Sequence, residues 1–188
     1  FYQNNKLNYV SKNKRRLKKM EVLRRMLLII VLLLSTIITA SATNIDKEQI
    51  SEELKKEEFI SEMNNSIQEA KKSFSDPIAV KIPHSMIIGM SILESAYGSS
   101  YKARKKNNFF GLKSGGDKYA KFDDMSESVE CLLKNLSQKE YYTNFQAALE
   151  NGEKNPHKLI AMIQKKYAED TEYAKKVSSI IKRWFTKV

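Results

Sequence analysis

The chain has 188 residues, with 33 Lys and Arg against 22 Asp and Glu, and a formal net charge of +11. This length allows one domain, or one domain with an appendage. Nine Lys or Arg and one Glu precede Thr43, a net charge of +8, which leaves +3 for the remainder. Because that remainder lacks the positive charge needed to neutralise many phosphates, the composition argues against a nucleic-acid partner.

Residues 1–42 have the order of a secretory signal peptide. A basic stretch precedes the apolar run 26–38, and an A-x-A cleavage site ends at Ala42. The run is shorter than the roughly 20 residues of a spanning helix, but the uncharged stretch continues to Ile45. The alternative is therefore an uncleaved membrane anchor at residues 26–45. In both cases we expect export, to the periplasm, the cell envelope or the medium.

The next segment is charged and helical in its apolar spacing. Residues 43–58 are dense in Glu and Lys and are expected to form a solvated helical arm, whereas residues 59–188 are expected to form the domain. The helix should end near Asp76 and Pro77, because proline disfavours the helical conformation of the residue before it.

A helix from Pro83 to about Tyr97 is apolar nearly all round and therefore belongs at the centre of the domain. Its one carboxylate, Glu94, lies close to the end that Gly98 should terminate. Burial favours the protonated form of a carboxyl group and raises its pKa, which suits a general acid at neutral pH. The alternative is a glutamate at the exposed end of a core helix.

The elements that follow are short. Ser99 or Ser100 should cap a short helix that ends at Asn107 and Asn108. Strands at 109–113 and 118–122 flank a loop with the composition of a hairpin turn, and Asp123 or Asp124 should cap the next helix, which includes residues 129–136.

Three more helices are expected, at 140–149, from Pro156 to Tyr167 with Asn155 as cap, and from Thr171 to Phe185. The fold class is therefore mainly α with a small β-hairpin lobe (α+β). His84 and His157 belong to no metal-ligand spacing, and we expect neither a metal nor a cofactor.

Several motifs resemble one family. The segment ILESAYGSS (92–100), followed by Ala103 and NNFFGLK (107–113), resembles the signature of bacterial peptidoglycan N-acetylglucosaminidases of the flagellar-rod-hydrolase and Bax-type group. Residues 122–142 and the closing segment KKYAEDTEYAKKVSSII (165–181) are similar to later parts of the same pattern. The resemblance covers about residues 59–184.

The resemblance implies a lysozyme-like fold and a glycan-cleaving groove between the helical lobe and the hairpin. It implies that Glu94 is the general acid that protonates the departing sugar oxygen, and that Tyr167 faces it. The implied substrate-binding residues are Tyr97 (in place of the usual Trp), Asn108, Phe110, Gly111 and Tyr119. The implied substrate is the glycan strand of peptidoglycan, cleaved by an exported endo-β-N-acetylglucosaminidase.

The second catalytic group has no clear match in the sequence. The hairpin carries Asp117 at its tip, and Asp123 and Asp124 at its exit favour a capping role. Three possibilities stay open: Asp117 as the base, assistance by the 2-acetamido group of the substrate, or an inactive relative. The functional alternatives are a muramidase or lytic transglycosylase on the same fold, and a non-catalytic, membrane-tethered wall-binding module.

Overall fold

The structure is a computed structural model that describes residues 47–186. The expected signal peptide (1–42) and the alternative anchor (26–45) lie outside these residues, and both stay predictions. Within residues 47–186, no helix combines the length and the apolar content that crossing a membrane requires. The described residues fall into two compact units that divide between Glu53 and Leu54.

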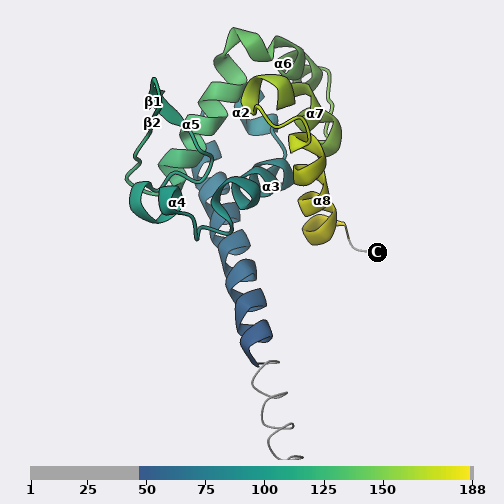
Figure 1. The fold of residues 1–188 in the computed structure, drawn as a ribbon. Helices are drawn as coiled ribbons and strands as arrows, with labels where there is room; N and C mark the ends of the chain where they lie inside the picture. Colours follow the sequence, from purple (N-terminus) through teal and green to yellow (C-terminus); the bar gives the residue numbers. More distant parts are fainter. Residues whose placement is uncertain (1–46, 187–188) are drawn as a thin grey trace, which may run out of the picture. The chain divides into compact units, whose positions relative to one another are not determined.

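Residues 47–73 are helical, and those before Leu54 are mostly exposed. The expected boundary between arm and domain at residue 58 stays a prediction. The elements that follow, drawn in Figure 1, are α2 (Pro77–Lys81), α3 (His84–Ser95), α4 (Tyr101–Lys106), β1 (Lys113–Gly115), β2 (Lys118–Tyr119), α5 (Met125–Gln138), the 3-10 helix η1 (Glu140–Tyr142), α6 (Thr143–Glu150), α7 (Pro156–Tyr167) and α8 (Tyr173–Phe185).

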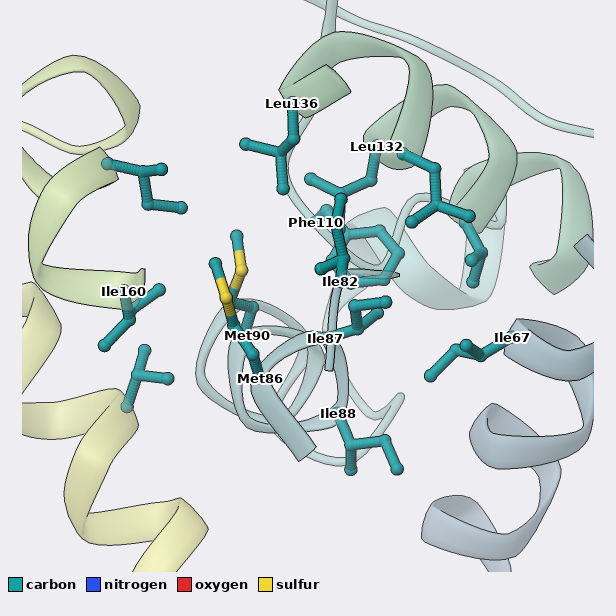
Figure 2. Packing of buried hydrophobic residues seen from close by; sticks show 14 of the residues in the cluster. Ile67, Ile82, Met86, Ile87, Ile88, Met90, Phe110, Leu132, Leu136 and Ile160 are labelled. Carbon is teal, nitrogen blue, oxygen red and sulfur yellow. The ribbon is translucent and has the colours of Figure 1, made fainter. Parts of the chain in front are cut away.

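Helix α3 is surrounded by other elements, as its apolar sequence predicts. Figure 2 shows its side chains facing Leu132 and Leu136 of α5, Ile160 of α7 and Ile67 of the helix at residues 47–73. Helix α8 packs so closely that a Cβ added at Gly89 would lie 2.9 Å from a side-chain carbon of Ile181. The core therefore fixes the position of α3, and with it the position of Glu94 in its last turn.

The caps of three helices agree with the sequence. The side chains of Ser100, Asp124 and Asn155 each accept a hydrogen bond from a backbone N–H in the first turn of α4, α5 and α7, respectively. These bonds satisfy donors that the start of a helix leaves without a backbone partner.

The first helix ends at Ser73, close to the predicted end near Asp76 and Pro77. Two other local features differ from the sequence analysis, which places no separate helix between Pro77 and Pro83. In the structure Pro77 begins α2, and the Asp76 carboxylate caps that helix by accepting from the Ile78 N–H at 2.8 Å. Proline suits the first turn of a helix because its missing N–H would have no partner there. Helix α8 begins at Tyr173, two residues after the expected start.

The hairpin is also shorter than predicted. Its antiparallel strands pair Lys113 with Tyr119 and Gly115 with Lys118, so residues 109–112 and 120–122 are not strand. The chain before it is held instead by Asn108, whose amide donates to Leu112 O and Ala120 O and accepts from Leu112 N–H. The fold class is nevertheless as predicted, mainly helical with one small hairpin among the described residues.

Candidate active site

Glu94 is partly buried in the last turn of α3, and it lines a groove of about 580 Å³. One side of the groove comes from α4 and the hairpin region, and the others come from the end of α5, η1 and the end of α7. Its lining residues are Glu94, Lys102, Phe110, Gly111, Leu112, Lys113, Tyr119, Asn135, Lys139, Tyr141, Tyr142, Lys166, Tyr167, Ala168 and Glu169.

The chain leaves α3 through a left-handed turn. Ala96, Tyr97 and Gly98 all have positive φ, of 49°, 54° and 75°. The buried Ser95 holds this turn, since its hydroxyl donates to Ser91 O at 2.6 Å and accepts from Gly98 N–H at 2.9 Å. Left-handed backbone is unfavourable for residues other than glycine and persists where surrounding contacts impose it. The turn therefore ends α3 directly after Glu94 and Ser95.

Burial raises the pKa of the Glu94 carboxyl above its ordinary value, and the positive charge of Lys102 opposes that rise. The Tyr173 hydroxyl also lowers the pKa of Glu94, and this is the smaller of the two opposing effects. That hydroxyl is buried and makes no hydrogen bond in the structure, so burial and the charge of Lys102 are the main influences on the pKa of Glu94. The balance favours a protonated carboxyl at higher pH than in water.

Gly111 lies directly against this carboxylate. A Cβ at residue 111 would lie 3.2 Å from Glu94 Oε2 and 3.1 Å from Lys102 Nζ. The φ of Gly111 is +67°, which also favours glycine. The Glu94 carboxylate and the Lys102 ammonium therefore face the same small space, which stays open because Gly111 has no side chain.

Tyr167 is the second predicted catalytic residue that reaches the groove. Its hydroxyl donates to Phe110 O at 2.9 Å, and its ring packs against that of Tyr173 with centroids 5.4 Å apart. Burial, followed by the negative charge of Glu94, raises the pKa of Tyr167 well above its ordinary value. Tyr167 therefore stays protonated and holds the segment before Gly111 in place.

Of the five predicted substrate-binding residues, the structure brings Phe110, Gly111 and Tyr119 to the groove. Tyr119 lies on the hairpin, and Lys102 Nζ is 4.6 Å from the centre of its ring. Asn108 is fully buried and its amide is used within the chain, so it supports the groove without lining it.

Tyr97 lies away from this groove. Its ring packs edge-on against Phe59 and Trp184, and its hydroxyl accepts a hydrogen bond from the Trp184 indole N–H at 2.9 Å. The structure therefore gives Tyr97 a packing position, in which it joins the turn after α3 to α8.

The three hairpin acids also stay out of the groove lining. Asp117 is fully exposed at the tip, 3.3 Å from Lys113 Nζ. Asp124 caps α5, and Asp123 pairs through its backbone with Asn107 and Glu127. Glu169, which sequence reasoning missed, is the second carboxylate that lines the groove in the described part of the chain.

Sequence reasoning also missed the effects of Lys102 and Tyr173 on the pKa of Glu94. Tyr173 lies in the closing segment that carries the family resemblance, so its presence there was a usable signal. For Lys102 the only signal was its place in a short helix between Glu94 and Gly111, which does not say which way the side chain points.

The comparison with known families shows which protein family the chain belongs to. Residues 64–185 match the glucosaminidase family, described as mannosyl-glycoprotein endo-beta-N-acetylglucosaminidase. The chain belongs to the glucosaminidase family. This membership confirms the resemblance drawn from the motifs and makes the chain a glycoside hydrolase.

Individual relatives agree with the family. Protein Bax of Escherichia coli (strain K12) is 34% identical over 74 residues, a match that covers 34% of this glucosaminidase and 27% of Bax. The catalytic domain of the autolysin Auto from Listeria monocytogenes has a similar fold, with a TM-score of 0.57 and 21% identity over 69% of this chain and 84% of that one. A truncated glycoside hydrolase domain of FlgJ from Salmonella typhimurium gives a TM-score of 0.52 and 17% identity, over 68% of this chain and 96% of that one.

The groove of this glucosaminidase is open and is lined by aromatic rings and polar groups together. Tyrosine side chains combine an apolar face with a polar tip and suit sugar rings, which have both characters. At its floor, the geometry offers one carboxyl with a raised pKa for proton donation.

Proposed function

We propose that this glucosaminidase is an exported peptidoglycan hydrolase that cleaves the glycan strand as an endo-β-N-acetylglucosaminidase, with Glu94 as general acid. The observation that carries the proposal is the partly buried carboxyl of Glu94, its pKa raised by burial, at the floor of the groove. A carboxyl group of this kind can hold a proton near neutral pH and pass it to the glycosidic oxygen as the bond breaks.

Peptidoglycan is the substrate that the relatives favour. The Listeria protein is named an autolysin, that is, an enzyme that lyses its own cell, and the family description names endo-β-N-acetylglucosaminidase activity. The bond broken in the proposed reaction is the β-1,4 bond on the reducing side of N-acetylglucosamine.

We propose that the carbonyl oxygen of the substrate's 2-acetamido group attacks the anomeric carbon while Glu94 protonates the departing oxygen and the glycosidic bond breaks. Water then adds to the anomeric carbon and opens the resulting ring, and the Glu94 carboxylate takes up the proton that the water releases. A protein base for direct inversion would need a carboxylate about 6.5–9.5 Å from the acid. Asp117 is fully exposed at the hairpin tip and absent from the groove lining, which weighs against it. The substrate-assisted route needs only Glu94 as the acid and a group that orients the acetamido.

Tyr167 is the residue we propose for that orientation. Because its hydroxyl proton is donated to Phe110 O, its oxygen can act as an acceptor for the acetamido N–H or for the attacking water. The raised pKa of Tyr167 keeps the hydroxyl neutral, so it adds no negative charge beside Glu94.

Export is proposed on the sequence alone, from the basic stretch, the apolar run 26–38 and the cleavage site at Ala42. The anchored form is the variant of this proposal in which residues 26–45 stay attached to the membrane.

The experiment compares the wild type with Glu94→Gln on purified peptidoglycan, with release of reducing ends as the measurement. Because general acid catalysis contributes about 10²- to 10⁴-fold, the variant should lose roughly that factor while keeping its melting temperature. Asp117→Asn is the matched control and should keep wild-type activity. Equal release by wild type and Glu94→Gln would exclude Glu94 as the acid, and a large loss in Asp117→Asn would exclude the substrate-assisted route.

A further inference from the structure

The walls of the groove carry more positive than negative charge. Four lysines line it, whereas the lining carboxylates among the described residues are Glu94 and Glu169. The lysines are Lys102, Lys113, Lys139 and Lys166. Since residues 43–188 carry a net charge of only +3, this gathering of lysines is a local feature of the groove.

Two of these lysines stand on the side of the groove away from the hairpin. Lys139 follows α5 and precedes η1, and Lys166 lies in the last turn of α7, which packs against η1. Both side chains are exposed, and neither has a carboxylate within 4.0 Å among residues 47–186. By contrast, Lys113 on the hairpin already pairs with Asp117.

The backbone at Lys139 is held in place. The Gln146 side-chain amide donates to Lys139 O at 3.0 Å and to Leu136 O at 3.1 Å. The Lys139 ammonium lies 5.8 Å from the centre of the Tyr141 ring, which also lines the groove. The Lys139 ammonium and the Tyr141 ring therefore both face the groove from a turn whose backbone is held in place.

A neutral sugar strand gives these cations no partner, because hydroxyl and acetamido groups carry no charge. Carboxylates would provide one, through charge-assisted hydrogen bonds. Resting on the proposed function, we propose that Lys139 and Lys166 form a subsite for carboxylates carried by the muramic acid residues of the strand. Those carboxylates come from the stem peptide or, where the peptide has been removed, from the lactyl group.

The test uses the full chain with Lys139→Gln, Lys166→Gln and the double variant. Lys134→Gln on α5 and Lys165→Gln on α7 are matched controls, since both lysines are exposed and neither lines the groove. The substrates are soluble strands with intact stems, the same strands with their carboxylates amidated, and strands stripped of their stems. The measurements are kcat/KM and direct binding of each strand, at low and high salt.

We expect each single variant to lower the ratio of kcat/KM for carboxylate-bearing over amidated strands about two- to five-fold, the range for an exposed ion pair of up to about 1 kcal/mol. The double variant should lose roughly tenfold, mainly through KM, and high salt should remove the difference by screening. The two controls should keep the wild-type ratio. A loss that persists on stripped strands assigns the lactyl carboxylate, and one confined to intact stems assigns the peptide.

A double variant with the wild-type ratio, and with wild-type binding of carboxylate-bearing strands, would overturn the subsite. Failure of the proposed function gives a different result, in which the wild type releases no reducing ends from any strand. The binding measurement still decides the subsite in that case, because it requires no turnover.

Discussion

Glu94 is subject to opposing influences, since burial raises its pKa while Lys102 lowers it. A general acid acts in its protonated form, so activity is lost as pH rises through its pKa. Replacing Lys102 by Met removes the opposing charge and raises the pKa of Glu94 further. The alkaline limb of the kcat/KM profile should therefore move to higher pH.

The measurement is kcat/KM against pH for the wild type, Lys102→Met and Lys105→Met. Lys105 is an exposed residue of the same helix that does not line the groove, so its variant should keep the wild-type profile. An alkaline limb that stays in place or moves to lower pH in Lys102→Met would contradict this assignment.

Gly111 offers a second test of the space around the carboxylate. Gly111→Ala should lower kcat, because the new methyl group would crowd Glu94 Oε2 at 3.2 Å and Lys102 Nζ at 3.1 Å. The variant should also lose about 1–2 kcal/mol of unfolding free energy, because residue 111 has a left-handed backbone that alanine disfavours.

Gly116→Ala separates these two effects. Gly116 also has a positive φ, of 53°, but nothing lies within 4 Å of a Cβ there. Its variant should lose similar stability and keep its kcat. Equal kcat values in the two variants would show that Gly111 does not protect the carboxylate.

The position of Glu94 in the last turn of a buried helix could be predicted, because a single carboxyl in an apolar helix is visible in the sequence. The positions of Lys102, Tyr173 and Glu169 could not, because they depend on which way side chains on separate elements point after folding. Tyr97 illustrates the same limit, since its place in the motif suggested a sugar contact and its ring packs against Phe59 and Trp184.

At the scale of elements, the end of α3 depends on Ser95. Ser95→Ala removes the acceptor for Gly98 N–H and should cost about 1–3 kcal/mol, the penalty for leaving a buried group without a partner. Because the turn fixes the end of α3, kcat should fall as well. Thermal unfolding and reducing-end release measure the two effects.

Ser99→Ala is the control for that variant. The Ser99 hydroxyl also bonds to the backbone of the turn, donating to Ala96 O at 2.7 Å, but it is exposed. Its loss should change stability little, and a Ser95→Ala variant as stable as Ser99→Ala would contradict the proposed part of Ser95.

The long helices and their caps could be predicted from apolar spacing and from Ser100, Asp124 and Asn155. The short elements could not. Helix α2 has five residues, too few for a periodic pattern. Beyond the strands, Ala120 N–H still donates to Leu112 O, but the Asn108 side chain accepts from Leu112 N–H and donates to Ala120 O, the two groups that the reciprocal ladder bond would have used.

At the scale of the whole chain, charge divides between the leader, with +8, and residues 43–188, with +3. If the leader is a cleaved signal peptide, the chain expressed in a bacterial host should be recovered outside the cytoplasm. Its mass should be that of a chain whose first residue is Thr43. Intact mass measurement of the exported fraction tests this. Full-length chain in the membrane fraction would favour the anchor, and full-length chain in the cytoplasm would contradict export.

The bond that the enzyme breaks is tested most directly by the chemical identity of the new reducing ends. Purified peptidoglycan is digested with the wild type, the products are reduced with borohydride, and the reduced sugars are identified by mass spectrometry. The proposed activity predicts reduced N-acetylglucosamine at the new ends, and none above background with Glu94→Gln. Reduced N-acetylmuramic acid, anhydro ends, or no new ends at all would contradict it.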